Sequence, residues 1–287
     1  MPLTLKKLHP SFGAQLLNTD LRAIKPGAIG EFVDLMDEHA VCAVPHEVPL
    51  TNEQHINFSK LLGPMERSAK KIAGTGKRLP YNEIIDQSNL GPQGTIYKNG
   101  DRRLAFKRAN RLWHTDMSFY QVRATYSILS AHIVPPEGGN TELIDMRAVY
   151  HDLPDAMKKR LDDMSAEHCY WHSRTLGGGP SPSIEEKAGR PPAIHPLVIE
   201  NRRTLRKSLY LASHIRSIQG MEKNQGAKLL KELNEFATQK QYILSYKWSV
   251  GDVLIWDNLA TMHRATPFPD QTYIRDMRRT TCREFEI

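Results

Sequence analysis

The sequence predicts one mainly β domain, a sheet sandwich or barrel that carries helical insertions. Three observations lead to this prediction. Strand-like segments dominate the second half of the 287-residue chain, helical periodicity is clearest in the first half, and strand-like segments resume after the stretch richest in glycine and proline. With no internal repeat and no clear linker, a single domain over residues 1–287 is the most economical arrangement.

Helices alternate with strand-like segments early in the chain. A helix is expected over 26–39, where a proline suits the first turn and apolar residues recur at helical spacing. The apolar segment 40–45 is expected to form a buried strand. Thr51 and Gln54 resemble a capping box for a second helix, which should end at Gly63.

Two segments are expected to be long and irregular. Residues 65–111 are rich in Gly, Lys, Asn and Arg and carry little periodicity, and residues 173–192 contain three consecutive glycines and four prolines. Long loops inside compact domains are usually functional. We therefore interpret the second segment as a flexible lid or an excursion.

Strands and short helices are expected in the rest of the chain. Asp145 can cap a short helix from 146, Pro154 can open another, and a longer helix is expected over 222–238. The expected strands are 124–135, 141–146, 242–248, 252–258 and 275–285.

Composition favours an intracellular, cytoplasmic protein. The apolar runs are far shorter than the roughly 18 to 20 residues of a membrane span, no signal-peptide pattern begins the sequence, and the three cysteines lie far apart. The net charge of +7 suits an anionic partner. The densest basic run, 99–111, could serve a small anion or simply form a solvated face. No aromatic and basic recognition module is evident, so we expect a small anionic organic substrate, no nucleic acid and no membrane, with a homo-oligomer possible.

The segment "LWHTDMSFY", 112–120, contains a candidate metal site. If it is a strand, His114 and Asp116 point to the same face. His263 follows a hydrophobic strand that should carry it to a sheet end. Two histidines and one carboxylate leave open positions on Fe(II) for a co-substrate and oxygen. A zinc hydrolase is the alternative, but it needs no keto-acid clamp. We expect nine other histidines, His214 among them, to be ordinary surface or core residues.

The last strand is rich in arginine. Arg275 and Arg279 should share one face of it, whereas Arg278 should point the other way. A guanidinium matches a carboxylate through two parallel hydrogen bonds. The strand therefore suits the far carboxylate of a keto acid, although a basic edge strand that discourages aggregation is the alternative.

Four segments together resemble the TauD/TfdA family of Fe(II)- and 2-oxoglutarate-dependent dioxygenases, and within it the 2,4-dichlorophenoxyacetate dioxygenase type. They are "LWHTD", "PPEGGNTELIDMRAVYHDLP", "GDVLIWDNLATMHRA" and "RDMRRTT". The resemblance covers nearly the whole chain. It implies a double-stranded β-helix, or jelly roll, with helices outside and with the segments 65–111 and 173–192 over the mouth of the active site.

The resemblance also implies roles for single residues. The implied iron ligands are His114, Asp116 and His263. The implied 2-oxoglutarate contacts are Thr141 and Arg275. The implied substrate-side residues are Arg279, Asn110, Lys71 and Trp256, with His195 near the place of a substrate-side histidine.

The implied reaction needs Fe(II), 2-oxoglutarate and O2. It hydroxylates an unactivated C–H bond of a small organic acid and converts 2-oxoglutarate to succinate, and an aryloxyalkanoate would lose its ether bond. The same chemistry on a sulfonate, an amino acid or a secondary-metabolite intermediate stays open. Nucleic-acid demethylation and a nonenzymatic anion-binding jelly roll are weaker alternatives.

Overall fold

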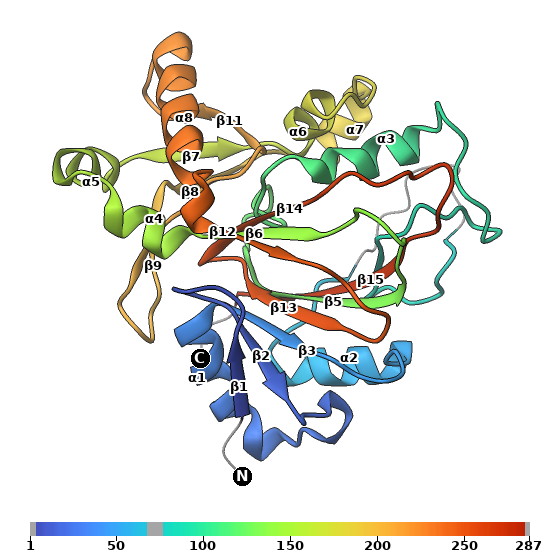
Figure 1. The fold of residues 1–287 in the computed structure, drawn as a ribbon. Helices are drawn as coiled ribbons and strands as arrows, with labels where there is room; N and C mark the ends of the chain where they lie inside the picture. Colours follow the sequence, from blue (N-terminus) through green and yellow to red (C-terminus); the bar gives the residue numbers. More distant parts are fainter. Residues whose placement is uncertain (1–3, 68–76, 285–287) are drawn as a thin grey trace.

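The fold is built around two β-sheets that pack face to face (Figure 1). A computed structural model describes residues 4–67 and 77–284. The larger sheet has the order β1-β2-β3-β13-β5-β15-β4, and the smaller has the order β12-β6-β14. The larger sheet contains β1 (Thr4–Lys7), β2 (Ala14–Leu17), β3 (Val41–Val44), β13 (Val253–Asp257), β5 (Ala124–Ile133), β15 (Asp276–Arg283) and β4 (Ile85–Asp86). The smaller contains β12 (Ile243–Tyr246), β6 (Thr141–Asp145) and β14 (Thr261–Ala265).

The facing sides of the two sheets form one apolar core. Leu254 and Trp256 of β13 pack in the same cluster as Leu143 of β6 and Leu244 of β12. The opposite face of the larger sheet is buried too, because Ile255 packs in the cluster under helices α1 and α2. A strand buried on both faces reads as a continuous apolar run, and "VLIW" is such a run.

Helices cover the sheets from outside. Helices α1 (Ile29–His39) and α2 (Asn52–Leu61) lie on the outer face of the larger sheet (Figure 1). Another apolar cluster joins α4 (Met146–Asp152), α5 (Asp155–Leu161) and α8 (Lys223–Ala237). Beside it are β7 (Ser165–His168), β8 (Ala193–Pro196), β9 (Val198–Glu200), β10 (Lys207–Leu209) and β11 (Ile215–Ile218). Within the described part of the chain, no helix is long and apolar enough to cross a membrane.

Several local predictions are confirmed. The capping box of Thr51 and Gln54 is present at the start of α2. The Asp145 side chain accepts a hydrogen bond from the backbone of Arg147 and begins α4. Each expected strand of the second half occurs at its predicted place, and the helix expected over 26–39 begins with a 3-10 turn, Pro26–Ala28.

The prediction of two irregular segments is wrong in part. Within 65–111 the structure has β4, helix α3 (Arg102–Arg108) and a 3-10 turn, Ala109–Arg111, whereas residues 68–76 lie outside the described part of the chain. The region 173–192 overlaps α6 (Tyr170–Leu176) and contains α7 (Ile184–Ala188). Helices of five to seven residues span fewer than two full turns, so they leave too short a periodic pattern to detect.

Candidate active site

His114 and His263 face each other across an isolated antiparallel bridge. The His114 amide donates to the His263 carbonyl at 3.0 Å, and the His263 amide donates back at 2.8 Å. The imidazole centroids are 4.3 Å apart. Asp116 follows two residues later, and one ligand atom from each of the three residues lies within 4.8 Å of the others. All three side chains are buried, and their spacing would let this metal set, His114, Asp116 and His263, hold one ion.

The route to this arrangement differs from the predicted one. The segment 112–120 is not a regular strand, because only His114 pairs there and Asp116 lies in a turn whose next residue, Met117, has φ 58°. His263 lies in the middle of β14, paired with Leu143, and not at a sheet end. The two histidines are therefore neighbours through backbone pairing, and the turn brings the carboxylate to them.

At neutral pH all three groups are in the protonation state that can bind a cation. His114 Nδ1 donates to the Leu112 carbonyl at 2.7 Å, which leaves its Nε2 lone pair toward Asp116 at 3.8 Å. Burial lowers the pKa of His114 to about 4 and that of His263 well below its ordinary value. Burial opposes ionisation of Asp116, but Arg279 and the two imidazoles lower its pKa to about 2. At neutral pH the set is two neutral imidazoles and one carboxylate, which fits Fe(II).

Hydrogen bonds from neighbouring strands orient the carboxylate. Ser127 on β5 donates to Asp116 Oδ2 at 2.7 Å, and Asn258 donates to Ser127 at 3.0 Å. The Asn258 carbonyl accepts from the Trp256 indole at 3.0 Å, and the Trp256 ring lies 4.6 Å from His263. Trp256 therefore supports the metal set from the side of His263. Such outer contacts fix ligand orientation in metal sites.

Two cavities meet at the metal set. One has a volume of about 340 Å³ and the other about 40 Å³. Both are lined by Gln87, Asn110, His114 and Arg279. Asp116 lines the larger cavity, whereas Thr141, Trp256, His263 and Arg275 line the smaller one. An open position of a metal held here could therefore be reached from either cavity.

Arg275 presents a buried positive charge to the smaller cavity. Its Nε donates to the Gly139 carbonyl at 3.1 Å, and its backbone amide donates to Asn89. Within the described residues no carboxylate forms an ion pair with it, and burial lowers the pKa of its guanidinium to about 10. Thr141 accepts from the Trp248 indole at 3.0 Å, which leaves its own hydroxyl hydrogen for another acceptor. A ligand carboxylate would satisfy both groups.

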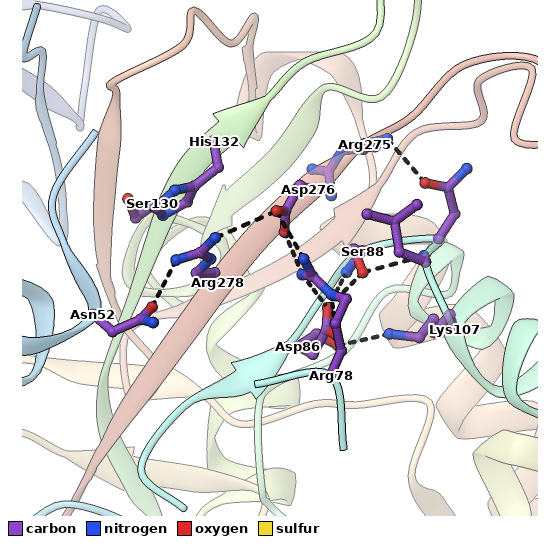
Figure 2. Close-up of polar contacts among 12 residues, drawn as sticks. Asn52, Arg78, Asp86, Ser88, Lys107, Ser130, His132, Arg275, Asp276 and Arg278 are labelled. Carbon is purple, nitrogen blue, oxygen red and sulfur yellow. Dashed lines mark hydrogen bonds and ion pairs between the residues drawn. The ribbon is translucent and has the colours of Figure 1, made fainter. Parts of the chain in front are cut away.

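Figure 2 shows the ion-pair network that holds the start of β15 beside Arg275. Arg78 donates to both Asp86 and Asp276, at distances from 2.5 to 3.1 Å. Lys107 donates to the Asp86 carbonyl at 2.7 Å. Arg278 lies on the other face of the strand, where it donates to Asn52 at 2.8 Å. The alternation expected from the sequence is therefore present, and the network fixes β4 against the strand that carries the arginines.

Arg279 points toward the metal set. Its guanidinium contacts Asp116, whereas Glu284, an acidic residue five positions further along the chain, pairs with Arg123 at 2.8 Å. Asn110 is oriented by two neighbours, because its carbonyl accepts from Arg174 at 3.0 Å and its amide donates to Gln87 at 3.0 Å. Both residues line both cavities. Lys71 lies outside the described residues.

Sequence reasoning missed several residues that line the larger cavity. His214 is buried with its ring centroid 6.1 Å from that of His114, and burial lowers its pKa well below the ordinary value. Arg174, Gln87 and Phe119 line the same cavity. Phe119 belongs to the segment 112–120, but no spacing links His214, Arg174 or Gln87 to that segment, so no local pattern could have indicated those three. His195 instead contacts the cavity indirectly, through the carbonyl of Tyr120 at 2.9 Å.

Two packed sheets enclose a buried set of two histidines and one carboxylate, beside an arginine that has no carboxylate partner among the described residues. This arrangement fits a mononuclear non-haem oxygenase that binds a small acid. Residues 4–281 match the family model "Taurine catabolism dioxygenase TauD, TfdA family". The chain belongs to this family, and it is an enzyme of the dioxygenase class whose site fits Fe(II) and 2-oxoglutarate.

Relatives and solved structures agree with this placement. The chain is 37% identical over 282 residues to the alpha-ketoglutarate-dependent 2,4-dichlorophenoxyacetate dioxygenase of Burkholderia sp. (strain RASC), covering 98% of this chain and 94% of that protein. It is 31% identical over 278 residues to the (S)-phenoxypropionate/alpha-ketoglutarate-dioxygenase of Sphingobium herbicidovorans, covering 94% and 91%. The crystal structure of AAD-2 in complex with Mn(II) and N-oxalylglycine has a TM-score of 0.94 at 37% identity, covering 100% of this chain and 99% of that one. Alpha-ketoglutarate is another name for 2-oxoglutarate.

Proposed function

We propose that this enzyme uses Fe(II), 2-oxoglutarate and O2 to oxidise an unactivated C–H bond of a small organic acid, with an aryloxyalkanoate as the leading candidate. One observation carries the proposal. The metal set lies where two cavities meet, and the smaller cavity contains Arg275, a buried guanidinium without a carboxylate partner among the described residues. A keto acid that chelates the metal and extends a second carboxylate to Arg275 fits this arrangement.

Each residue has a distinct task in the proposal. His114, Asp116 and His263 hold Fe(II), while Arg275 and Thr141 hold the far carboxylate of 2-oxoglutarate. When bound, the iron, the keto acid and O2 supply the oxidation, in which 2-oxoglutarate is converted to succinate and CO2.

The substrate occupies the larger cavity in this proposal. Arg279 and Asn110 face it, Trp256 supports the metal set, and Lys71 remains a predicted contact from the sequence. The wall also contains Phe119, which suits an aromatic or apolar body. Two relatives are named for 2,4-dichlorophenoxyacetate and phenoxypropionate, both aryloxy acids. Hydroxylation of a carbon bearing an ether oxygen gives a hemiacetal, which collapses to a phenol and a carbonyl compound.

Further features of the proposal rest on family membership and on the sequence. We infer that the two sheets form a double-stranded β-helix, since the family's solved relatives superpose over the whole chain. A cytoplasmic location, a homo-oligomer, and the lack of nucleic-acid or membrane partners remain predictions from the sequence.

Succinate release across a panel of acids tests the function. The purified protein is given Fe(II), 2-oxoglutarate and O2 with 2,4-dichlorophenoxyacetate, 2-phenoxypropionate, a sulfonate or an amino acid. We expect succinate above the substrate-free rate with at least one aryloxy acid, and little with its primary amide. The His114→Ala variant serves as the inactive control. Succinate with none of the acids would overturn the proposal, and zinc-supported hydrolysis without 2-oxoglutarate would favour the hydrolase.

A further inference from the structure

A third cavity, of about 70 Å³, lies beside the smaller cavity. Its walls come from residues 87–89, from α3 and the turn after it, and from the segment 265–275, and we call it the side cavity. It shares Ala265 and Arg275 with the smaller cavity, and neither residue lines the larger one. Figure 2 shows Lys107 and Arg275, both of which line the side cavity. The side cavity therefore reaches the arginine assigned to 2-oxoglutarate from a side that the larger cavity does not.

A hydrogen-bonded pair of side chains lies at the junction of the three cavities. Gln87 and Asn110 line all three, and the Asn110 amide donates to the Gln87 carbonyl oxygen at 3.0 Å. Arg174 donates to the Asn110 carbonyl oxygen at 3.0 Å and fixes the pair from the other side. A molecule in the larger cavity would cover the metal set and close that way to the smaller cavity. It would not occupy the side cavity.

The outer rim of the side cavity is positively charged. Arg108 donates to both carboxylate oxygens of Asp270, at 2.9 and 2.7 Å, and Arg111 donates to one of them at 2.8 Å. The two arginine side chains are 35% and 33% exposed, so this end of the cavity lies at the surface, whereas Asp270 is buried. Two guanidinium groups share one carboxylate, which leaves a net positive charge for an approaching anion. Exposed ion pairs contribute little stability, so the pair of Arg111 and Asp270 can open readily.

The dimensions and the inner end of the side cavity suit a keto acid that moves through it. A volume of about 70 Å³ has room for a few waters, so 2-oxoglutarate can pass only when Arg111 leaves Asp270 and turns toward solvent. At the inner end, Arg275 stands between the side cavity and the smaller cavity. A keto acid that enters with its keto end first would bring that end to the metal set. Its far carboxylate would then come to rest at Arg275.

We propose that the side cavity is a separate passage for 2-oxoglutarate and succinate, opened by separation of Arg111 from Asp270. The inference rests on the proposed function, in which Arg275 holds the far carboxylate of 2-oxoglutarate. It adds that the co-substrate exchanges through the rim at Arg108 and Arg111 while the substrate acid stays in the larger cavity. Succinate keeps the same far carboxylate and leaves by the same passage.

A passage and a structural role predict different kinetics. A residue that lines a passage changes the barrier between the free and bound states. It therefore changes the association and dissociation rates of 2-oxoglutarate by the same factor and leaves the dissociation constant unchanged. A residue that only stabilises the protein or contacts bound 2-oxoglutarate changes the dissociation constant instead. The two rates together separate these roles, and neither depends on turnover.

The experiment follows 2-oxoglutarate binding by stopped-flow tryptophan fluorescence, with Mn(II) in place of iron so that no turnover occurs. Trp256 lines the smaller cavity and the Trp248 indole donates to Thr141, so both can report on a ligand there. The rates are measured with the larger cavity empty and with it filled by saturating 2,4-dichlorophenoxyacetate. Titration calorimetry gives the dissociation constant independently.

Three variants are compared with the wild type. Thr266→Phe narrows the side cavity without changing its charge, and Arg111→Ala removes one of the ion pairs that close the rim. Arg103→Ala is the matched control, because it removes an arginine of the larger cavity that pairs with Asp101 at 2.7 Å. Thermal melting confirms that each variant is folded.

With the acid in the larger cavity, the wild type should still bind and release 2-oxoglutarate. Thr266→Phe should lower both rates by about fivefold or more, because a ring must be displaced from the passage, and should keep the dissociation constant. Arg111→Ala should raise the dissociation rate by up to about fivefold, the factor for one exposed ion pair. Arg103→Ala should leave both rates unchanged.

The inference is wrong if the acid blocks both binding and release of 2-oxoglutarate, since the larger cavity is then the route. It is also wrong if Thr266→Phe changes the dissociation constant through only one of the rates, or if Arg103→Ala acts as strongly as Arg111→Ala. If Thr266→Phe does not fold, a block by the acid or an unchanged dissociation rate in Arg111→Ala overturns it. If calorimetry shows no binding of 2-oxoglutarate to the wild type with Mn(II), the proposed function itself has failed.

Discussion

Replacing Arg275 with methionine should stabilise the ligand-free protein slightly while removing most of its affinity for 2-oxoglutarate. Burial lowers the pKa of this guanidinium from its ordinary value of 12.5 to about 10, with no other cause. At about 1.4 kcal/mol per pH unit, burial disfavours the charged form by about 3 kcal/mol. Methionine does not carry this cost, but it loses the hydrogen bond to the Gly139 carbonyl, which is worth about 1 kcal/mol. The expected net gain in unfolding free energy is therefore up to about 2 kcal/mol.

The loss of 2-oxoglutarate affinity should be larger than that gain. Truncating one partner of a buried charge pair costs about 2 to 5 kcal/mol, which weakens binding about thirty-fold or more. Urea denaturation with and without 2-oxoglutarate, with Mn(II) in place of iron to prevent turnover, measures both effects in one assay. Titration calorimetry then gives the dissociation constant directly.

Arg278→Met is the matched control, because Arg278 lies on the other face of the same strand and bonds to Asn52 and Asp276. It should lose stability and keep its affinity for 2-oxoglutarate. The reasoning is refuted if Arg275→Met binds 2-oxoglutarate as tightly as the wild type, or if both variants lose affinity equally. An unchanged affinity in Arg275→Met would place the clamp elsewhere in the cavity.

Three further predictions test the site and the core. Asp116→Ala should abolish turnover and remove the rise in melting temperature on adding Mn(II), yet keep the far-ultraviolet spectrum of a folded protein; retained activity would exclude the assigned ligand set. Gly139→Ala should raise the 2-oxoglutarate requirement about tenfold or more, because Gly139 has φ +67° and an added Cβ would lie 3.3 Å from Arg275; an unchanged KM for 2-oxoglutarate would contradict this. Burial lowers the pKa of His55 to about 3. The unfolded chain binds a proton there below about pH 6.5 and the folded protein does not, so stability should fall by about 2 kcal/mol between pH 7 and pH 5. His55→Gln should show a weaker loss in urea denaturation at the two pH values, and an equal loss would assign the acid sensitivity to other groups.

The strand and cap predictions succeeded where a pattern is local. The apolar run of β13 is long enough to read as a buried strand, and the cap of α2 needs only Thr51 and Gln54, three residues apart. The short helices α6 and α7 were missed because three glycines follow α6 and glycines and prolines precede α7, and the same rules treat these residues as loop signals. Local sequence rules reflect backbone preference, whereas the helical conformation of these two segments depends on tertiary contacts.

The metal set was predicted from a premise that does not hold. The H-x-D spacing was read as one face of a strand, but Asp116 returns toward His114 through a turn with Met117 at positive φ. The two histidines are 149 positions apart, and their meeting depends on the pairing of a short bridge with β14. Residue types suited to a metal can therefore be recognised in a sequence even when the path that joins them cannot. Arg174 had no such signal, because an arginine on a short helix becomes unusual only when its neighbours are seen to lack a carboxylate.

Arg275 and Arg174, two buried arginines without a carboxylate partner among the described residues, suggest how the fold is prepared for its ligands. Arg275 lines the smaller cavity and Arg174 the larger, and the metal set lies where these cavities meet. Burial disfavours the charge of each guanidinium, as the lowered pKa values of both show. A sequence selected for stability alone would place a carboxylate beside each, or a neutral side chain in its place. Keeping both charges costs stability in the ligand-free protein, and an anion in each cavity would offset part of that cost. Occupation of the two cavities should therefore stabilise the protein in separate steps, with 2-oxoglutarate raising the melting temperature of Arg174→Gln and the substrate acid raising that of Arg275→Met.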